Sequence, residues 1–228
     1  MAALPELIDK LDTFEIVRDE VAAILLLETT QQQALAVATL PTPRDPYPWA
    51  FRVFTERMNP WGEFLDLPTD TGPLPILPLV NVWWSGITFD KSASNVVERQ
   101  KGTSTINVDC YAYATSEDIL GGGHKPGDEN AQRAVQRVVR LVRNILMAGQ
   151  YTYLGLQGTV WTRWIHGIEI FEPPVDVRSA QRIGAARITL HVDHSEFSPQ
   201  VGGVPLELIS TTVERGDTGQ IYFTADHP

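Results

Sequence analysis

The sequence contains a single cysteine, Cys110, so it cannot form an internal disulfide. Cys110 alternates with Ile106 and Val108 in the stretch TINVDCYAY, a pattern typical of a strand with one buried face. A thiol in apolar surroundings stays protonated, which argues against a nucleophilic role for Cys110. A chain without disulfides suits synthesis in a reducing cytoplasm.

The sequence also lacks a long apolar run. The longest is VAAILLL, residues 21–27, which lies between two glutamates and is far shorter than the roughly 20 residues that cross a bilayer. The N-terminus, MAALPELIDKLD, has no basic segment followed by an apolar one, so no secretory signal is expected. With 43% hydrophobic and 20% charged residues, the composition indicates an ordinary globular protein, and we expect no contact with a membrane.

An excess of basic residues is absent as well. The formal charge is -10, and residues 1–90 hold 13 acidic and 5 basic side chains against 15 and 13 in the remainder. Proteins that grip nucleic acid present a basic surface that neutralises phosphates. The charge therefore disfavours a nucleic-acid binder, although the protein could sit beside DNA without binding it.

Catalytic motifs are missing too. No GxSxG or HExxH pattern occurs, and the five histidines are scattered along the chain. Gly122 and Gly127 have the spacing of a phosphate-binding loop, but Asp128 stands where that loop needs a lysine. We therefore predict neither an enzyme nor a cofactor.

One cluster of potential metal ligands is present. The stretch HVDHSEF, residues 191–197, holds two histidines, an aspartate and a glutamate, and it ends a stretch with strand-like alternation. Alternation places His191 and Asp193 on one face of that strand and His194 and Glu196 on the other, so one ion cannot reach all four. A metal-dependent hydrolase that uses His191 and Asp193, with a third ligand such as His166, remains the alternative from another functional class.

The hydrophobic periodicity predicts two main helices and about seven strands. A helix is expected over residues 14–33, with Asp12 or Thr13 as its cap, and a second over 131–149, with Asp128 as its cap and Gly149 at its end. A packed, proline-rich segment of about residues 41–78 separates the first helix from most of the strands. The later strands are too close for helical crossovers, so we predict a single α+β domain, residues 1–228, with two main helices on a largely antiparallel or mixed sheet.

Two surfaces are candidates for partners. Arg133, Arg137 and Arg140 recur along one side of the second helix, either as its solvated face or as an interface to carboxylates of another subunit. A polar segment from Lys91 to Thr103 is too poor in apolar residues to bury itself, and we predict a mobile arm there. The candidate arm residues are Lys91, Asn95, Val96, Val97, Glu98 and Arg99.

Six stretches taken together resemble the tail terminator and tail-completion proteins of the neck of tailed bacteriophages. They are VFTERMNPW, PLVNVWW, NVVERQKGTSTINVDCYAYAT, GDENAQRAVQRVVRLVRNILMAG, LGLQGTVWTRWIHGIEIFEPP and VDHSEFSPQ. The resemblance extends from about Phe14 to Phe223 and rests on the order of elements. It carries no catalytic or metal-binding residues.

The resemblance implies a structural protein of the virion, assembled in the host cytoplasm. Such proteins have a small α+β fold and form a ring, commonly a hexamer, that caps the tail tube and docks to the head connector, while genomic DNA passes through the lumen. This chain is longer than the smallest members of the family. A neighbouring neck component, such as a head–tail joining protein, is therefore the closest alternative.

Overall fold

The computed structural model describes residues 11–39, 50–65, 77–91, 99–119, 123–173 and 182–197, together with the backbone of 209–214 and 221–227. The chain forms two compact units, one of Leu11–Phe197 and one of Met1–Lys10 with Ser198–Pro228. The predicted single domain of residues 1–228 stays a prediction for the whole chain.

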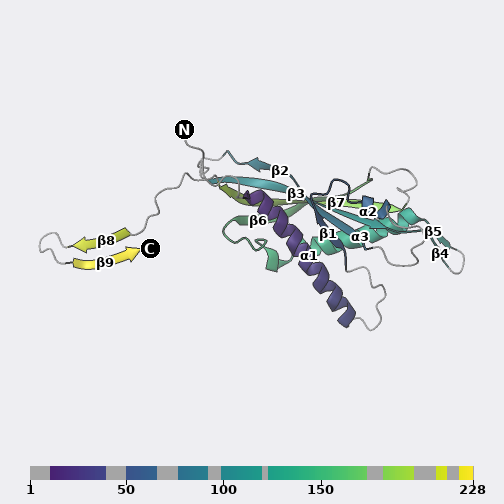
Figure 1. The fold of residues 1–228 in the computed structure, drawn as a ribbon, viewed down its shortest axis with the longest axis horizontal. Helices are drawn as coiled ribbons and strands as arrows, with labels where there is room; N and C mark the ends of the chain where they lie inside the picture. Colours follow the sequence, from purple (N-terminus) through teal and green to yellow (C-terminus); the bar gives the residue numbers. More distant parts are fainter. Residues whose placement is uncertain are drawn as a thin grey trace. The chain divides into compact units, whose positions relative to one another are not determined.

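The larger unit is built on one five-stranded sheet. Its strands, in spatial order, are β1 (Arg52–Thr55), β2 (Leu79–Phe89), β3 (Arg99–Tyr113), β7 (Ile183–Phe197) and β6 (Val160–Phe171). The short edge strand β1 runs parallel to β2, and every other pair is antiparallel (Figure 1). The predicted α+β fold with a mixed, largely antiparallel sheet is confirmed.

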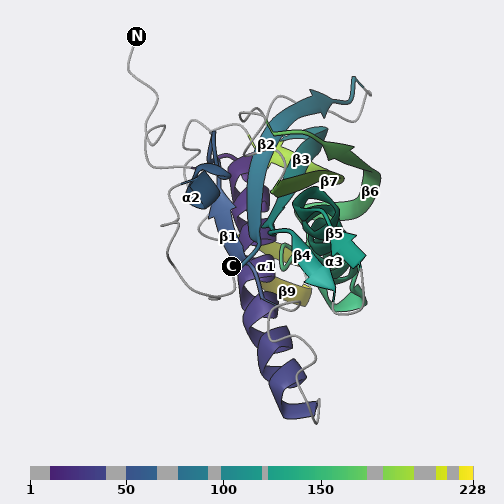
Figure 2. The same ribbon diagram turned by 90° about the vertical axis from the view of Figure 1, so that its right-hand side faces the viewer.

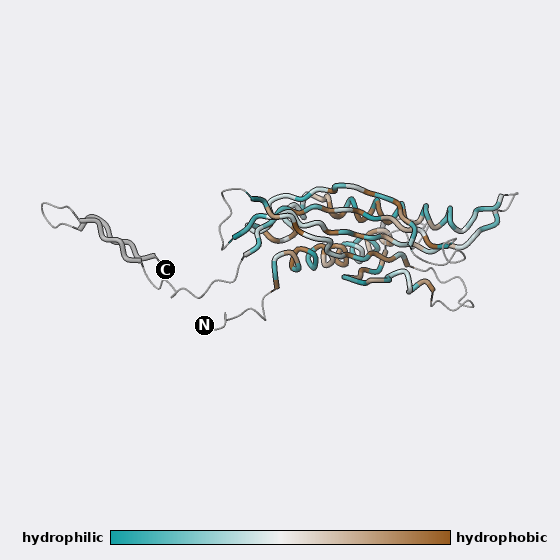
Figure 3. The backbone as a smooth tube through the Cα atoms, turned by 90° about the horizontal axis from the view of Figure 1, so that it is seen from above, coloured by the Kyte–Doolittle hydropathy of each residue, from teal (hydrophilic) through white to brown (hydrophobic). Residues whose placement is uncertain are grey.

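Two long helices, α1 (Thr13–Thr39) and α3 (Gly127–Leu146), pack on the same face of this sheet. Most of the apolar side chains that recur at helical spacing are buried there, namely Val17, Val21, Ile24 and Leu25 of α1 and Ala131, Val135, Val138, Val142, Ile145 and Leu146 of α3. Phe14 of the same series is only partly buried. Figure 3 shows hydrophobic and hydrophilic residues alternating along the strands beneath them. Cys110 is buried in the same core, and burial raises the pKa of its thiol far above the ordinary value.

Among the described residues, the opposite face of the sheet is covered at one end. There α2 (Gly62–Leu65) and Trp61 pack over Leu79, Tyr111 and Ile183. The short strands β4 (Glu117–Ile119) and β5 (Gly123–Lys125) form a hairpin before α3, and a 3-10 turn, η1 (Gly149–Tyr151), follows it. In the second unit, β8 (Ile209–Glu214) pairs antiparallel with β9 (Ile221–His227).

Helix α1 extends past the end of the sheet, as Figure 2 shows. It is six residues longer than predicted at its C-terminal end, and Leu26, Leu35 and Val37 remain more than half exposed. By length and composition alone, α1 could cross a bilayer, although a third of its most apolar window is buried within the protein.

Three predicted details are wrong. Helix α3 begins at Gly127, so Asp128 lies in its first turn, where its carboxylate accepts the backbone N–H of Glu129 at 2.8 Å. The helix ends at Leu146, and Gly149 opens the 3-10 turn instead of closing the helix. The predicted arm also overlaps β3, because Arg99 to Thr103 pair with β7; residues 92–98 lie outside the described residues.

Candidate functional site

Strand β7 separates the histidine and acidic cluster as its alternation predicts. His194 is fully buried on the helix side of the sheet, whereas His191 lies half-buried on the other side. His194 and His191 therefore lie in different chemical environments, and each contacts different residues.

Glu196 forms the N-terminal cap of α1. Its carboxylate accepts the backbone N–H of Thr13 at 2.9 Å and that of Phe14 at 2.7 Å. Such caps satisfy N–H groups that have no partner within the helix, and the helix dipole favours the negative charge. Burial nevertheless raises the pKa of Glu196, against the effect of these hydrogen bonds. The sequence placed the cap on Asp12 or Thr13, and only the fold brings Glu196 to this helix end.

Ser104, His194 and Glu196 together have the residue types of a catalytic triad. The Oγ of Ser104 lies 2.7 Å from Nε2 of His194, and Nδ1 of His194 lies 3.6 Å from Oε1 of Glu196. However, Ser104 and His194 have no exposed surface, and the Glu196 oxygens are engaged by the helix. A nucleophile without solvent access cannot meet a substrate, so the group is structural. Burial lowers the pKa of His194 and so favours its neutral form.

The proposed metal pair lies on the opposite face. The rings of His191 and His166 stack with centroids 4.5 Å apart and an angle of 11°, and Trp164 meets His191 edge-on at 5.2 Å. Asp193 accepts the hydroxyl of Thr103 at 2.6 Å. Stacked rings direct their nitrogens outward in parallel planes, so this geometry lends the metal-hydrolase alternative no support. Within the described ranges, no three His, Cys, Asp or Glu residues gather as a metal site.

The arginines of α3 lie on the helix surface away from the core. Arg133, Arg137 and Arg140 are exposed, and Arg133 forms an ion pair with Glu129 at 2.7 Å on the same helix. Exposed pairs of this kind contribute only about 0.3–0.5 kcal/mol. Arg133 therefore stays exposed on the same side of α3 as Arg137 and Arg140.

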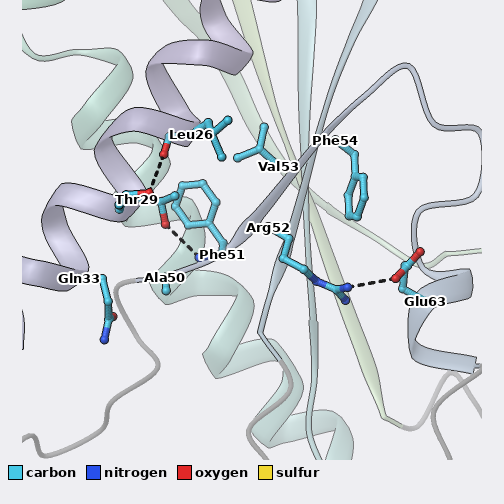
Figure 4. A pocket seen from close by; sticks show the side chains of 10 residues that line it. Leu26, Thr29, Gln33, Ala50, Phe51, Arg52, Val53, Phe54 and Glu63 are labelled. Carbon is cyan, nitrogen blue, oxygen red and sulfur yellow. Dashed lines mark hydrogen bonds and ion pairs between the residues drawn. The ribbon is translucent and has the colours of Figure 1, made fainter.

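A groove that no sequence pattern predicted lies between α1 and the edge strand β1. It has a volume of about 640 Å³ and is open to solvent. Figure 4 shows Leu26, Thr29 and Gln33 of α1 on one side and the residues of β1 on the other. The backbone N–H of Phe51 donates to the Thr29 hydroxyl at 3.0 Å, and Arg52 pairs with Glu63 at 3.0 Å on the far side.

A comparison of the sequence with models of known protein families finds no match, and a comparison with curated proteins finds no match either.

Proposed function

We propose that the chain is a structural protein of the neck of a tailed bacteriophage, a tail terminator whose copies form a hexameric ring. The ring caps the tail tube and joins it to the head connector. The observation that carries this proposal is the architecture of residues 11–197, in which two helices cover one face of a single mixed sheet. The sequence resemblance implies a fold of this kind.

The local geometry of the polar clusters favours a structural role over catalysis. Glu196 holds the start of α1, and Ser104 with His194 fills the space beside it. These groups keep α1 on the sheet. The exposed surfaces that remain, the α3 arginines and the groove at β1, have the character of contact surfaces.

In this proposal a ring closes through two different patches on each copy, because a heterologous contact generates rings when the rotation closes. The α3 arginines contact carboxylates in the acidic first 90 residues of the next copy. Planar guanidinium groups favour paired contacts with carboxylates. Contacts between exposed charges weaken with salt.

The first experiment measures assembly by light scattering and negative-stain imaging at low and high salt, with and without purified tail tubes. We expect rings that weaken at high salt, and Arg140→Glu should weaken them further. The matched control is Arg182→Glu, an exposed arginine outside α3. A protein that stays monomeric at high concentration and forms no ring on tail tubes would contradict the proposal.

The same purified protein distinguishes the two neck roles. A terminator binds to tail tubes, whereas a head–tail joining protein binds first to heads that carry the connector. If the protein binds to heads but not to tail tubes, its role is that of a head–tail joining protein and not that of a terminator.

A further inference from the structure

The sheet of residues 11–197 has two edges of different character. At one edge β1 pairs only with β2, and at the other β6 pairs only with β7 among the described strands. Unpaired strand edges are templates for pairing with another chain. The 12-residue β6 exposes Ile168 and Ile170, at 45% and 62%.

The backbone of β1 has hydrogen-bonding groups that point away from the sheet. Arg52 and Glu56 donate their N–H groups to the carbonyls of Pro78 and Val82, each at 2.9 Å. Because alternate residues of a strand direct their N–H groups to opposite sides, the N–H and carbonyl of Val53 point outward into the groove. Among the described residues, neither group of Val53 has a partner.

The apolar residues at the two edges lie on the same side of the sheet. Val53 is opposite Val80, whose side chain is in the core beneath α1, and Leu26 of α1 lines the groove above β1. At the other edge, Ile168 and Ile170 are opposite Ile188 and Ala186, which also face the helices. A β6 strand from another copy, placed beside β1, would therefore bring Ile168 and Ile170 against Leu26.

The charges on the other side of the sheet are complementary. Beside β1, Arg52 and Arg57 share one carboxylate, that of Glu63, at 3.0 and 2.6 Å. On β6, Glu169 is exposed on this side, and exposed Glu172 follows the strand. Among the described residues on this side, two guanidinium groups thus meet one carboxylate beside β1, whereas β6 presents exposed carboxylates.

We propose that β6 of one copy adds to β1 of the next copy, with its isoleucines in the groove between β1 and α1. Successive strands of the sheet reverse direction from β2 to β6, and β1 runs with β2, so the new pair is antiparallel. Each copy uses two different edges, and the contact is heterologous. This proposal rests on the ring assembly proposed above, and it makes the pairing of β6 with β1 the main contact between neighbouring copies.

The test uses two variants of the full chain that each block one edge. Leu26→Asp places a charge in the groove, and the double variant Ile168→Asp with Ile170→Asp places charges on β6. Each should weaken self-association about tenfold or more, because a charge is then buried without a partner. Val53→Pro removes the outward N–H as a second way to block β1, which an edge strand tolerates.

Mixing the two variants gives the sharpest result. A Leu26→Asp copy retains a normal β6, and a β6 variant retains a normal groove, so one intact interface forms per pair. We expect a heterodimer by analytical ultracentrifugation that grows no further, whereas each variant alone stays monomeric. Leu35→Asp is the matched control, because Leu35 is 54% exposed against 57% for Leu26 and lies on the opposite side of the helix.

The outcomes separate this interface from the ring itself. If the wild-type chain assembles and both variants assemble equally well, the edge contact is overturned and the ring remains. If each variant is monomeric but the mixture yields no heterodimer, the contact does not join β1 to β6. A wild-type chain that is monomeric with and without tail tubes overturns both proposals.

Discussion

At the scale of single residues, buried carboxylates hold the helices in place. Glu28 of α1 is only 6% exposed and accepts hydrogen bonds from Tyr151 at 2.5 Å, Gln150 at 3.0 Å and Gln32 at 3.1 Å. These bonds, that of Tyr151 foremost, lower the pKa of Glu28. The hydrogen bonds from Gln150 and Tyr151 tie the middle of α1 to the turn that follows α3.

Tyr151→Phe tests this contact, because it removes the strongest donor to a buried charge. We expect a loss of about 1.5–3 kcal/mol in the free energy of unfolding at neutral pH, measured by urea denaturation. Tyr153→Phe, at an exposed tyrosine two residues away, is the control and should have little effect.

The same contact has a defined pH dependence. Because the folded pKa of Glu28 lies below its ordinary value of 4.5, its stabilisation is present above that value and disappears as pH falls through the folded pKa. The difference between wild type and Tyr151→Phe should therefore shrink in acid. A difference that stays constant from neutral to strongly acidic pH would show that the charge of Glu28 has no part in it.

At the scale of elements, two contacts position α3: a side chain from β6 binds its C-terminal end, and its N-terminal part packs closely on β7. Arg163 of β6 donates to the carbonyls of Leu146, Ala148 and Tyr151, so its guanidinium binds the end of the helix. Burial lowers the pKa of Arg163. At the other end, Gly184 of β7 lies directly against Ala131.

Gly184→Ala tests that approach. A Cβ at this position would lie 2.9 Å from the backbone carbon and oxygen of Ala131, so α3 would have to move. We expect the free energy of unfolding to fall by about 1–3 kcal/mol, measured as a lower urea midpoint. Gly167→Ala in β6 is the control, since its Cβ would meet nothing within 4 Å. Equal effects of the two substitutions would contradict the close packing of α3 on β7.

At the scale of the whole molecule, the net charge of -10 bears on contact with DNA. A ring through which a genome passes must not hold the duplex, because each phosphate that a cation neutralises adds affinity. Acidic side chains repel DNA only near the wall of a channel, since the Debye length is about 8 Å at physiological salt. The charge also keeps a protein in solution, whatever its function.

We therefore expect the purified protein not to bind duplex DNA. The measurement is the fluorescence anisotropy of a labelled duplex of random sequence, titrated with protein at low and at physiological salt. Non-specific binders have dissociation constants of about 10⁻⁴–10⁻⁶ M at physiological salt. Salt-dependent binding in that range would contradict the prediction that DNA passes through the proposed ring without being bound.

The sequence by itself determined the fold class, the buried stripes of α1 and α3, and the opposite orientation of His191 and His194. These follow from local periodicity, because a period of 3.6 or 2 sets which side chains share a face. Only the tertiary structure decided that Glu196 caps α1, that Arg163 binds the carbonyls at the end of α3, and that α1 and β1 enclose a groove. Those contacts join residues far apart in the chain, and no local pattern encodes which distant polar group satisfies a helix end or which strand is left at an edge.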